Sequence, residues 1–262
     1  MHVEISETNA VATVTLKRPE KHNALNLKLI KALVEAGQAL GNRADIRAVV
    51  LTGAGASFCA GLDVAAMPQI AAMAAKSGGI MARSHGDANL FQAVSTIWGD
   101  LPMPVIAAVQ GYAFGGGFQI MLGADIRVAH PDTKFSIMEA KWGLVPDMGG
   151  MVAMHRLARA DVIRRLTYTA EVFDGNAALE WGFVTELAAD PLARATALAA
   201  EIAGRSPDAV RAAKRLIDAT ARADKAATLL AESRAQDALV GQPNQMEAVM
   251  AGFEKRPPVF KD

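Results

Sequence analysis

The chain of 262 residues has a single cysteine, Cys59, and no net charge. One cysteine cannot form an internal disulfide, so a reducing compartment is the simplest expectation. Lysine plus arginine total 27, as do aspartate plus glutamate, whereas a nucleic-acid surface or a polybasic membrane patch normally unbalances that count. The charge balance therefore predicts neither a nucleic acid nor a membrane as partner.

Long apolar runs are also missing. No stretch approaches the roughly 20 residues that a transmembrane helix needs. Residues 1–7 lack the basic and apolar regions of a secretory signal, so we expect a cytoplasmic protein. Apolar residues nevertheless make up 52% of the chain and charged residues 21%, which predicts a substantial hydrophobic core.

The first hundred residues mix strand and helix patterns. Alternating runs at residues 2–6 and 11–16 predict a hairpin. Asn26 can cap a helix whose apolar residues recur at helical spacing, and residues 48–53 predict a buried strand that ends in a glycine turn. Residues 65–100, rich in alanine, methionine, glycine and serine, predict helices without clear boundaries.

The remainder predicts short strands followed by helices. Strand patterns lie at residues 105–109, 126–129 and 135–138, and an apolar helix is predicted at 118–124. After residue 174 the chain is mostly helical. Ser206 and Pro207 mark a helix start, and amphipathic helix then continues to residue 252, with an interruption at 241–243.

These patterns predict an α/β fold in two regions. A mixed α/β core would occupy residues 1–195, and a helical C-terminal region would occupy residues 196–262.

Two glycine-bearing turns, residues 57–63 and 115–117, each follow a predicted strand. Backbone N–H groups are natural donors to a developing oxyanion, and glycine lets a substrate approach the main chain closely. The second turn also opens a helix, whose N-terminus favours negative charge. Ordinary turn chemistry is the alternative for either turn taken alone.

Glu139 is the first candidate acid/base residue, because Phe135, Met138 and Trp142 surround it in the sequence. Partial desolvation by these residues would raise the pKa of its carboxyl toward that of a useful base. The alternative is a solvated loop carboxylate paired with Lys141.

Asp147 is the second candidate, set between Pro146 and a pair of glycines. That setting is typical of a turn residue or a helix cap, and neither role excludes catalysis. The histidines at positions 22, 85, 130 and 155 have no metal-type spacing, so no metal site is predicted.

Four blocks of sequence, in order, resemble the crotonase superfamily, the enoyl-CoA hydratase/isomerase proteins. They are residues 18–25 (RPEKHNAL), 58–63 (FCAGLD), 104–117 (PVIAAVQGYAFGGG) and 252–262 (GFEKRPPVFKD). The resemblance implies a spiral of β-β-α units with a helical C-terminal region that supports homotrimers, often paired into hexamers. It implies an acyl-CoA thioester as substrate and no separate cofactor, because coenzyme A arrives as part of the substrate.

The resemblance also assigns residues. Ala60 and Gly116 match the positions whose backbone N–H groups form the family's oxyanion hole. The CoA-binding positions correspond to His22, Asn23, Ala24, Leu25 and Asp63.

Typical hydratases of this family carry two glutamates, and the matching positions here are Gln119 and, twenty residues later, Glu139. A glutamine can orient a water or the substrate but cannot donate a carboxyl proton, which puts ordinary hydration in doubt. A single glutamate at the Glu139 position resembles the enoyl-CoA isomerases, and Asp147 matches the second acid/base of the dienoyl-CoA isomerases. Double-bond isomerisation is therefore the leading hypothesis. A hydratase, a hydroxyacyl-CoA thioester hydrolase and a non-catalytic acyl-CoA binder remain alternatives.

Overall fold

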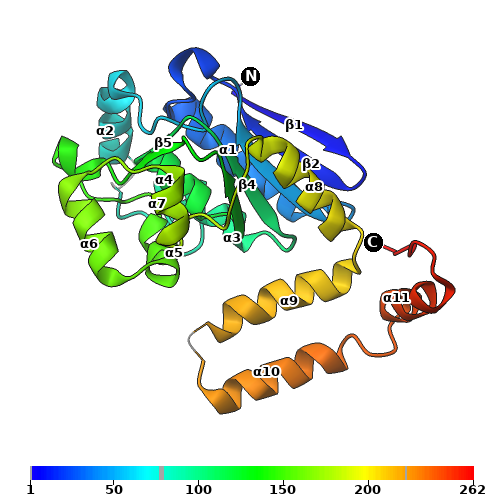
Figure 1. The fold of residues 1–262 in the computed structure, drawn as a ribbon. Coiled ribbons are helices and arrows are strands. Elements are labelled where there is room, and N and C mark those ends of the chain that lie inside the picture. Colours follow the sequence, from blue (N-terminus) through cyan, green and yellow to red (C-terminus); the bar gives the residue numbers. More distant parts are fainter. Residues whose placement is uncertain (1, 77–79, 222) are drawn as a thin grey trace.

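The computed structural model describes residues 2–76, 80–221 and 223–262. Its larger sheet has six strands in the order β1-β2-β3-β4-β6-β8, with β1 and β2 antiparallel and the others parallel (Figure 1). The strands are β1 Val3–Thr8, β2 Val11–Leu16, β3 Ala48–Gly53, β4 Val105–Val109, β6 Ile126–Ala129 and β8 Glu186–Leu187. A second, parallel sheet pairs β5 Tyr112–Phe114 with β7 Lys134–Ser136.

Helices surround both sheets and continue into the C-terminal region. The α-helices are α1 Leu27–Gly41, α2 Met67–Lys76, α3 Leu90–Asp100, α4 Gly116–Leu122, α5 Gly150–Leu157, α6 Ala160–Thr169, α7 Gly175–Glu180, α8 Pro191–Ala203, α9 Pro207–Thr220, α10 Lys225–Asp237 and α11 Pro243–Glu254. In the described ranges the structure also has three 3-10 helices: η1 Pro19–Lys21, η2 Val64–Ala66 and η3 Glu139–Trp142. None of the helices in the described part of the chain is long and apolar enough to cross a membrane.

The central strands β3 and β4 of the larger sheet are buried on both faces. Along β3, Val49 and Leu51 belong to the main core with α1 and α3, whereas Ala48 and Val50 belong to a second core formed with α8. A parallel strand covered by helices on both sides is expected to be continuously apolar, and all six residues of β3 are buried. The predicted strand at residues 48–53 is therefore confirmed, as is the α/β fold class.

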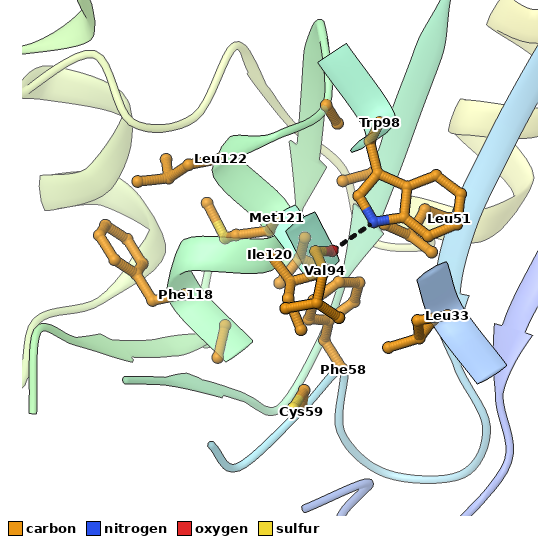
Figure 2. Close-up of a cluster of buried hydrophobic side chains, with 14 of the residues drawn as sticks. Leu33, Leu51, Phe58, Cys59, Val94, Trp98, Phe118, Ile120, Met121 and Leu122 are labelled. Atoms are coloured by element: carbon orange, nitrogen blue, oxygen red, sulfur yellow. Dashed lines mark hydrogen bonds between the residues drawn. The ribbon is translucent and has the colours of Figure 1, made fainter. Parts of the chain in front are cut away.

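The main core also fixes the two glycine turns. Figure 2 shows Phe58 and Cys59, from the first turn, in one cluster with Phe118 and Ile120 from α4, which follows the second turn. Phe58, Cys59 and Phe118 are fully buried. Because both turns attach to the same packed cluster, their backbones are held at a defined separation.

The C-terminal helices extend away from the sheets (Figure 1). α9 is attached through Lys214, whose buried Nζ donates to Asp125 Oδ2 at 2.8 Å and to Met103 O at 3.1 Å. The end of the chain returns to the body, where Arg47 donates to Phe260 O at 3.1 Å. Helix α8 crosses residue 195, the predicted boundary, and packs on the sheet, so contact with the sheet continues to about Ala203.

Most predicted elements are present, with several corrections. The hairpin, the capping of α1 by Asn26 and the capping of α9 by Ser206 are confirmed. The strand predicted to reach residue 138 ends at Ser136, and β5, α5 and α6 were not predicted.

The two poorly defined stretches also resolve into separate elements. The stretch 65–100 contains α2 and α3, although its residues 77–79 lie outside the described part. The long C-terminal helix is interrupted between α9 and α10 as well as at residues 241–243, and residue 222 in the first interruption is not described.

Two glycines with nearly the same backbone angle test how closely the 110–112 turn is packed. Gly111 has φ +64° and a Cβ there would lie 2.0 Å from Ala56 O, whereas Gly86 has φ +62° and open space around it. Gly86→Ala should therefore lose only about 1 kcal/mol of unfolding free energy, from backbone strain. Gly111→Ala should lose about 3 kcal/mol or more, or fail to fold, in urea denaturation. Equal losses for the two variants would show that the turn is not packed as described.

Candidate active site

Residues 57–63 form an extended segment between two other segments. On one side Cys59 pairs with Ala113 of β5, and on the other Leu62 pairs with Leu25. Cys59 N–H donates to Tyr112 O at 2.9 Å, and Leu25 N–H donates to Gly61 O at 2.7 Å. The segment therefore joins the loop before α1 to the small sheet.

The hydrogen bonds along this segment show which of its backbone donors are already used. Ala60 N–H donates to His22 O and Asp63 N–H donates to Leu25 O, each at 2.9 Å. Gly61, with φ +87°, interrupts the extended conformation after Ala60, so the direction of Leu62 N–H follows from its neighbour Asp63 and is opposite to the Leu25 side. Within the described residues it has no hydrogen-bond acceptor.

The assignment of Ala60 as an oxyanion donor is therefore not supported, because its N–H is already used within the fold. Leu62 N–H has no acceptor among the described residues, and neither has its neighbour Gly61 N–H.

The second turn supplies another unpaired donor. Gly116 is the first residue of α4, and the N–H groups of a first helical turn have no acceptor within the helix. None of the described residues accepts from Gly116 N–H. A Cβ at Gly116 would lie 2.6 Å from Met148 Sδ and 2.8 Å from Leu25 Cδ1, so both side chains pack closely against this glycine.

The two free donors belong to neighbouring turns. A Cβ on Gly61, the residue before Leu62, would lie 2.6 Å from Phe114 O, two residues before Gly116. Two unpaired N–H groups at such a junction, one of them at a helix N-terminus, can stabilise a developing negative charge.

Glu139 lies next to this junction. A Cβ on Gly115 would lie 3.3 Å from Glu139 Oε1, so the carboxylate is beside the peptide that carries Gly116 N–H. The residue is only 9% exposed. Oε1 accepts a hydrogen bond from Gln119 Nε2 at 2.7 Å, and Oε2 is buried with no partner in the part of the chain that the structure describes.

The environment of Glu139 favours its protonated form. Burial raises the pKa of this carboxyl, and repulsion from Asp147 raises it further, whereas its own backbone N–H and Gln119 oppose the shift. The interpretation as a solvated loop carboxylate paired with Lys141 is therefore wrong. A buried carboxylate with an unpaired oxygen and a raised pKa is suited to general-base catalysis.

Gln119 is buried in α4 at 1% exposure and uses both ends of its amide. Its Oε1 accepts from Met148 N–H at 2.9 Å and from Gly150 N–H at 3.0 Å, and its Nε2 donates to Glu139. Its amide therefore connects η3, α4 and the turn before α5.

Asp147 lies in the exposed loop between η3 and α5, and its side chain reaches solvent. The surrounding protein still desolvates the carboxyl enough to raise its pKa. The cap interpretation is wrong, since the residue at the N-cap of α5 is Gly149 and no side chain caps it. Asp147 is close enough to Glu139 for the two carboxylates to repel each other.

The predicted CoA-binding residues are held together by internal bonds. Asn23 is buried and its Nδ2 donates to Ala54 O at 2.9 Å and Ser57 O at 2.7 Å. Arg18 pairs with Asp63 at 2.7 Å and also donates to Ala24 O at 2.8 Å. The side chains of Asn23 and Asp63 thus hold the loop to the 57–63 segment.

His22 is the exposed member of this group. Its Nδ1 lies 3.0 Å from Ser57 Oγ, and its ring contacts that of Tyr112 edge-on at 5.4 Å. Leu25, in contrast, is fully buried and packs against Gly116. The structure therefore brings residues 22–25 against the same turn that carries the free Leu62 N–H.

Comparison with known proteins identifies the family of the chain. The sequence profile of the enoyl-CoA hydratase/isomerase family matches residues 6–262, so the chain belongs to that family. The predicted membership of the crotonase superfamily is confirmed.

Individual relatives cover almost the whole chain. The chain is 34% identical to the probable enoyl-CoA hydratase echA6 of Mycobacterium bovis, over 99% of each sequence. It is 31% identical to a short-chain-enoyl-CoA hydratase of Clostridium acetobutylicum, over 97% of this chain and 95% of that protein. A crystal structure of enoyl-CoA hydratase from Bacillus anthracis superimposes with a TM-score of 0.89 at 27% identity, covering 100% of this chain and 99% of the other.

Sequence reasoning located Gln119, Glu139, Asp147 and Gly116 but missed two features. The free Leu62 N–H could have been found only from the pairing of the segment on both sides. The bonds from Met148 and Gly150 to Gln119 span about thirty residues and leave no local pattern.

The raised pKa of Glu139 predicts a pH-dependent cost in stability. A carboxyl whose folded pKa is raised stabilises the fold below its unfolded pKa, about 4.3, and loses that contribution as pH rises through its folded pKa. Glu139→Gln removes this titration. Its melting temperature should therefore rise relative to the wild type as pH increases from about 4 to 8.

Differential scanning fluorimetry across this pH range measures the difference. Glu232→Gln on α10 is the control, because that glutamate is exposed. A Glu139→Gln difference that does not change with pH would contradict the described burial of the charge.

Proposed function

We propose that this protein isomerises a carbon–carbon double bond in an enoyl- or dienoyl-CoA thioester. The observation that carries the proposal is the single buried carboxylate of Glu139, with Oε2 unpaired, beside two unpaired backbone N–H groups. Gln119, at the neighbouring position, has no ionisable group and has both amide ends engaged.

The proposed reaction needs one base and an oxyanion site. Glu139 removes a proton from the carbon next to the thioester carbonyl, and the electron pair moves into the carbonyl to form an enolate. Leu62 and Gly116 N–H groups donate to the enolate oxygen, and losing one such donor typically costs about 3–4 kcal/mol. The enolate then collapses, the double bond shifts, and Glu139 returns the proton to a carbon further along the chain.

Asp147 supplies a second carboxylate, which would extend the proposed reaction to dienoyl-CoA substrates. A dienoyl substrate separates the two carbons that lose and gain the proton, so a second carboxylate near the distal carbon becomes useful. Asp147 raises the pKa of Glu139, and its own pKa is raised by partial desolvation from the surrounding protein. We assign it as the partner acid/base for such substrates.

We propose that the CoA part of the substrate binds along residues 22–25. In support of this placement, these residues adjoin the segment that carries Leu62 N–H, and His22 is exposed there. Asn23 and Asp63 would contribute by fixing the loop rather than by direct contact, because their side chains already have internal partners.

Hydration of an enoyl-CoA is the second candidate function. The names of the relatives support it, since the mycobacterial and clostridial proteins are both named as hydratases. Hydration requires an activated water as well as a proton donor. Glu139 would then perform both tasks, with Asp147 as the second carboxylate.

The C-terminal helices are proposed as the interface of a homotrimer or a hexamer. Support comes from their apolar exposure: α10 buries none of its described residues, Leu229 and Leu230 on it are exposed, and Phe253 on α11 is 80% exposed. Apolar surface of this kind is typical of protein interfaces.

Product analysis tests the proposal. Purified protein is incubated with a 3-enoyl-CoA, a 3,5-dienoyl-CoA, crotonyl-CoA and 3-hydroxyisobutyryl-CoA. The products are identified by liquid chromatography against reference thioesters. We expect a shifted double bond with one or both of the first two substrates. Glu139→Gln should reduce kcat/KM at least 100-fold while thioester binding stays within a few-fold.

Asp147→Asn separates the two isomerase variants, because it should impair only dienoyl turnover. Brisk hydration of crotonyl-CoA without isomerisation would replace the proposal with the hydratase function. Release of free CoA from 3-hydroxyisobutyryl-CoA would indicate a hydrolase, and binding of all four without turnover would indicate an acyl-CoA binder. Retention of more than about a tenth of kcat/KM in Glu139→Gln would show that Glu139 is not the base.

A further inference from the structure

Three hydrogen bonds fix the orientation of the Gln119 amide. Two backbone N–H groups, from Met148 and Gly150, point at one end of it, so that end must be the oxygen. The other end is then the NH2 group, which lies 2.7 Å from Glu139 Oε1 and must donate to it. A flipped amide would set NH2 against two N–H donors and its oxygen against a carboxylate.

This orientation distinguishes the two oxygens of Glu139. Oε1 receives the amide N–H and is held toward α4, whereas Oε2 is buried without a partner among the described residues. A carboxylate oxygen that already accepts a strong hydrogen bond is the less basic of the pair. The proton should therefore be taken and returned by Oε2.

The same amide fixes the turn that follows Asp147. Met148 and Gly150 hold Gln119 Oε1 from both sides of Gly149, and a Cβ on Gly150 would lie 2.9 Å from that oxygen and 2.6 Å from Gln119 Cγ. A shift of this turn would break at least one of these bonds. Gln119 thus sets the position of the Asp147 loop relative to Glu139.

We propose that Gln119 is a positioning residue that selects Glu139 Oε2 as the proton-transferring atom and fixes the turn carrying Asp147 against it. The proposal rests on the assignment of Glu139 as the base in the proposed function. Gln119 itself touches neither substrate nor water, since it is buried and both ends of its amide are engaged. A glutamate in its place could still accept from Met148 and Gly150 but would face Glu139 with a second carboxylate, so the pair would have to share a proton.

Two substitutions separate the contact with Glu139 from the contact with the turn. Gln119→Glu keeps an acceptor for Met148 and Gly150 N–H and loses the donor to Glu139, whereas Gln119→Met loses both. With Gln119→Glu, the acid limb of the kcat/KM profile should move up by about one pH unit or more, while thioester binding stays within about threefold. Gln119→Met should shift the limb in the same direction and also lower the melting temperature.

An infrared titration of the protonated Glu139 carboxyl measures the same shift without turnover. For each variant, the spectrum of the same protein with Glu139→Gln added is subtracted. If the wild type is not an isomerase, this titration still tests the positioning role. If Glu139→Gln remains active, the proposed function falls, and the titration decides the role of Gln119 separately.

If the Glu139 titration and the pH profile of kcat/KM in Gln119→Glu are the same as in the wild type, the proposal is overturned. Gln119 would then only hold the turn. The proposal would also be overturned if the Glu139 titration shifted in Gln119→Met but not in Gln119→Glu.

Should Gln119→Glu fail to fold, Gly150→Ala provides a second route, since the new methyl group displaces Gln119. Gly252→Ala is its control, because a Cβ there meets no atom within 4 Å. Gly150→Ala should move the titration of Glu139 and Gly252→Ala should not. Identical titrations in the two variants would contradict the positioning role.

Discussion

The pairing of residues 57–63 on both sides is the constraint on which the site depends. Cys59 bonds to β5 and Gly61 bonds to Leu25, so the segment cannot move without breaking hydrogen bonds in two directions. This pairing uses Ala60 N–H and leaves Leu62 N–H free. The same segment places residues 22–25 next to the glycine turn that begins α4. Main-chain pairing, rather than any side chain, therefore creates the proposed oxyanion site.

Burial of Glu139 is the second requirement, and it has a cost. A carboxylate with one unpaired buried oxygen is less favourable in the folded protein than in water, because desolvation is only partly offset by the bond from Gln119. The surrounding packing must hold it in place. Gly115, Gly116 and Gly150 permit this packing, since a Cβ on any of them would approach Glu139, Met148 or Gln119. Stability is thus given up where the proposed chemistry needs a basic oxygen.

Local patterns predicted most of the architecture and much of the site. Buried strands such as 48–53 and capped helices such as the one after Asn26 have short-range signals, and both were found as predicted. Family resemblance then identified Glu139 and Gln119. The error at Ala60 and the omission of β5 have one cause, because Ala60 bonds to His22, 38 residues away, and β5 pairs with Cys59, 54 residues from Ala113. Such pairing has no local signature in a single sequence.

The central claim is that Glu139 removes a proton next to a thioester whose oxygen is held by Leu62 and Gly116 N–H groups. Deuterium incorporation tests it most directly: a 3-enoyl-CoA is incubated with the protein in heavy water, and label at the carbon beside the carbonyl is followed by NMR. Wild-type protein should introduce label there, and Glu139→Gln should slow the exchange at least 100-fold. Equal exchange by the two proteins would contradict the account.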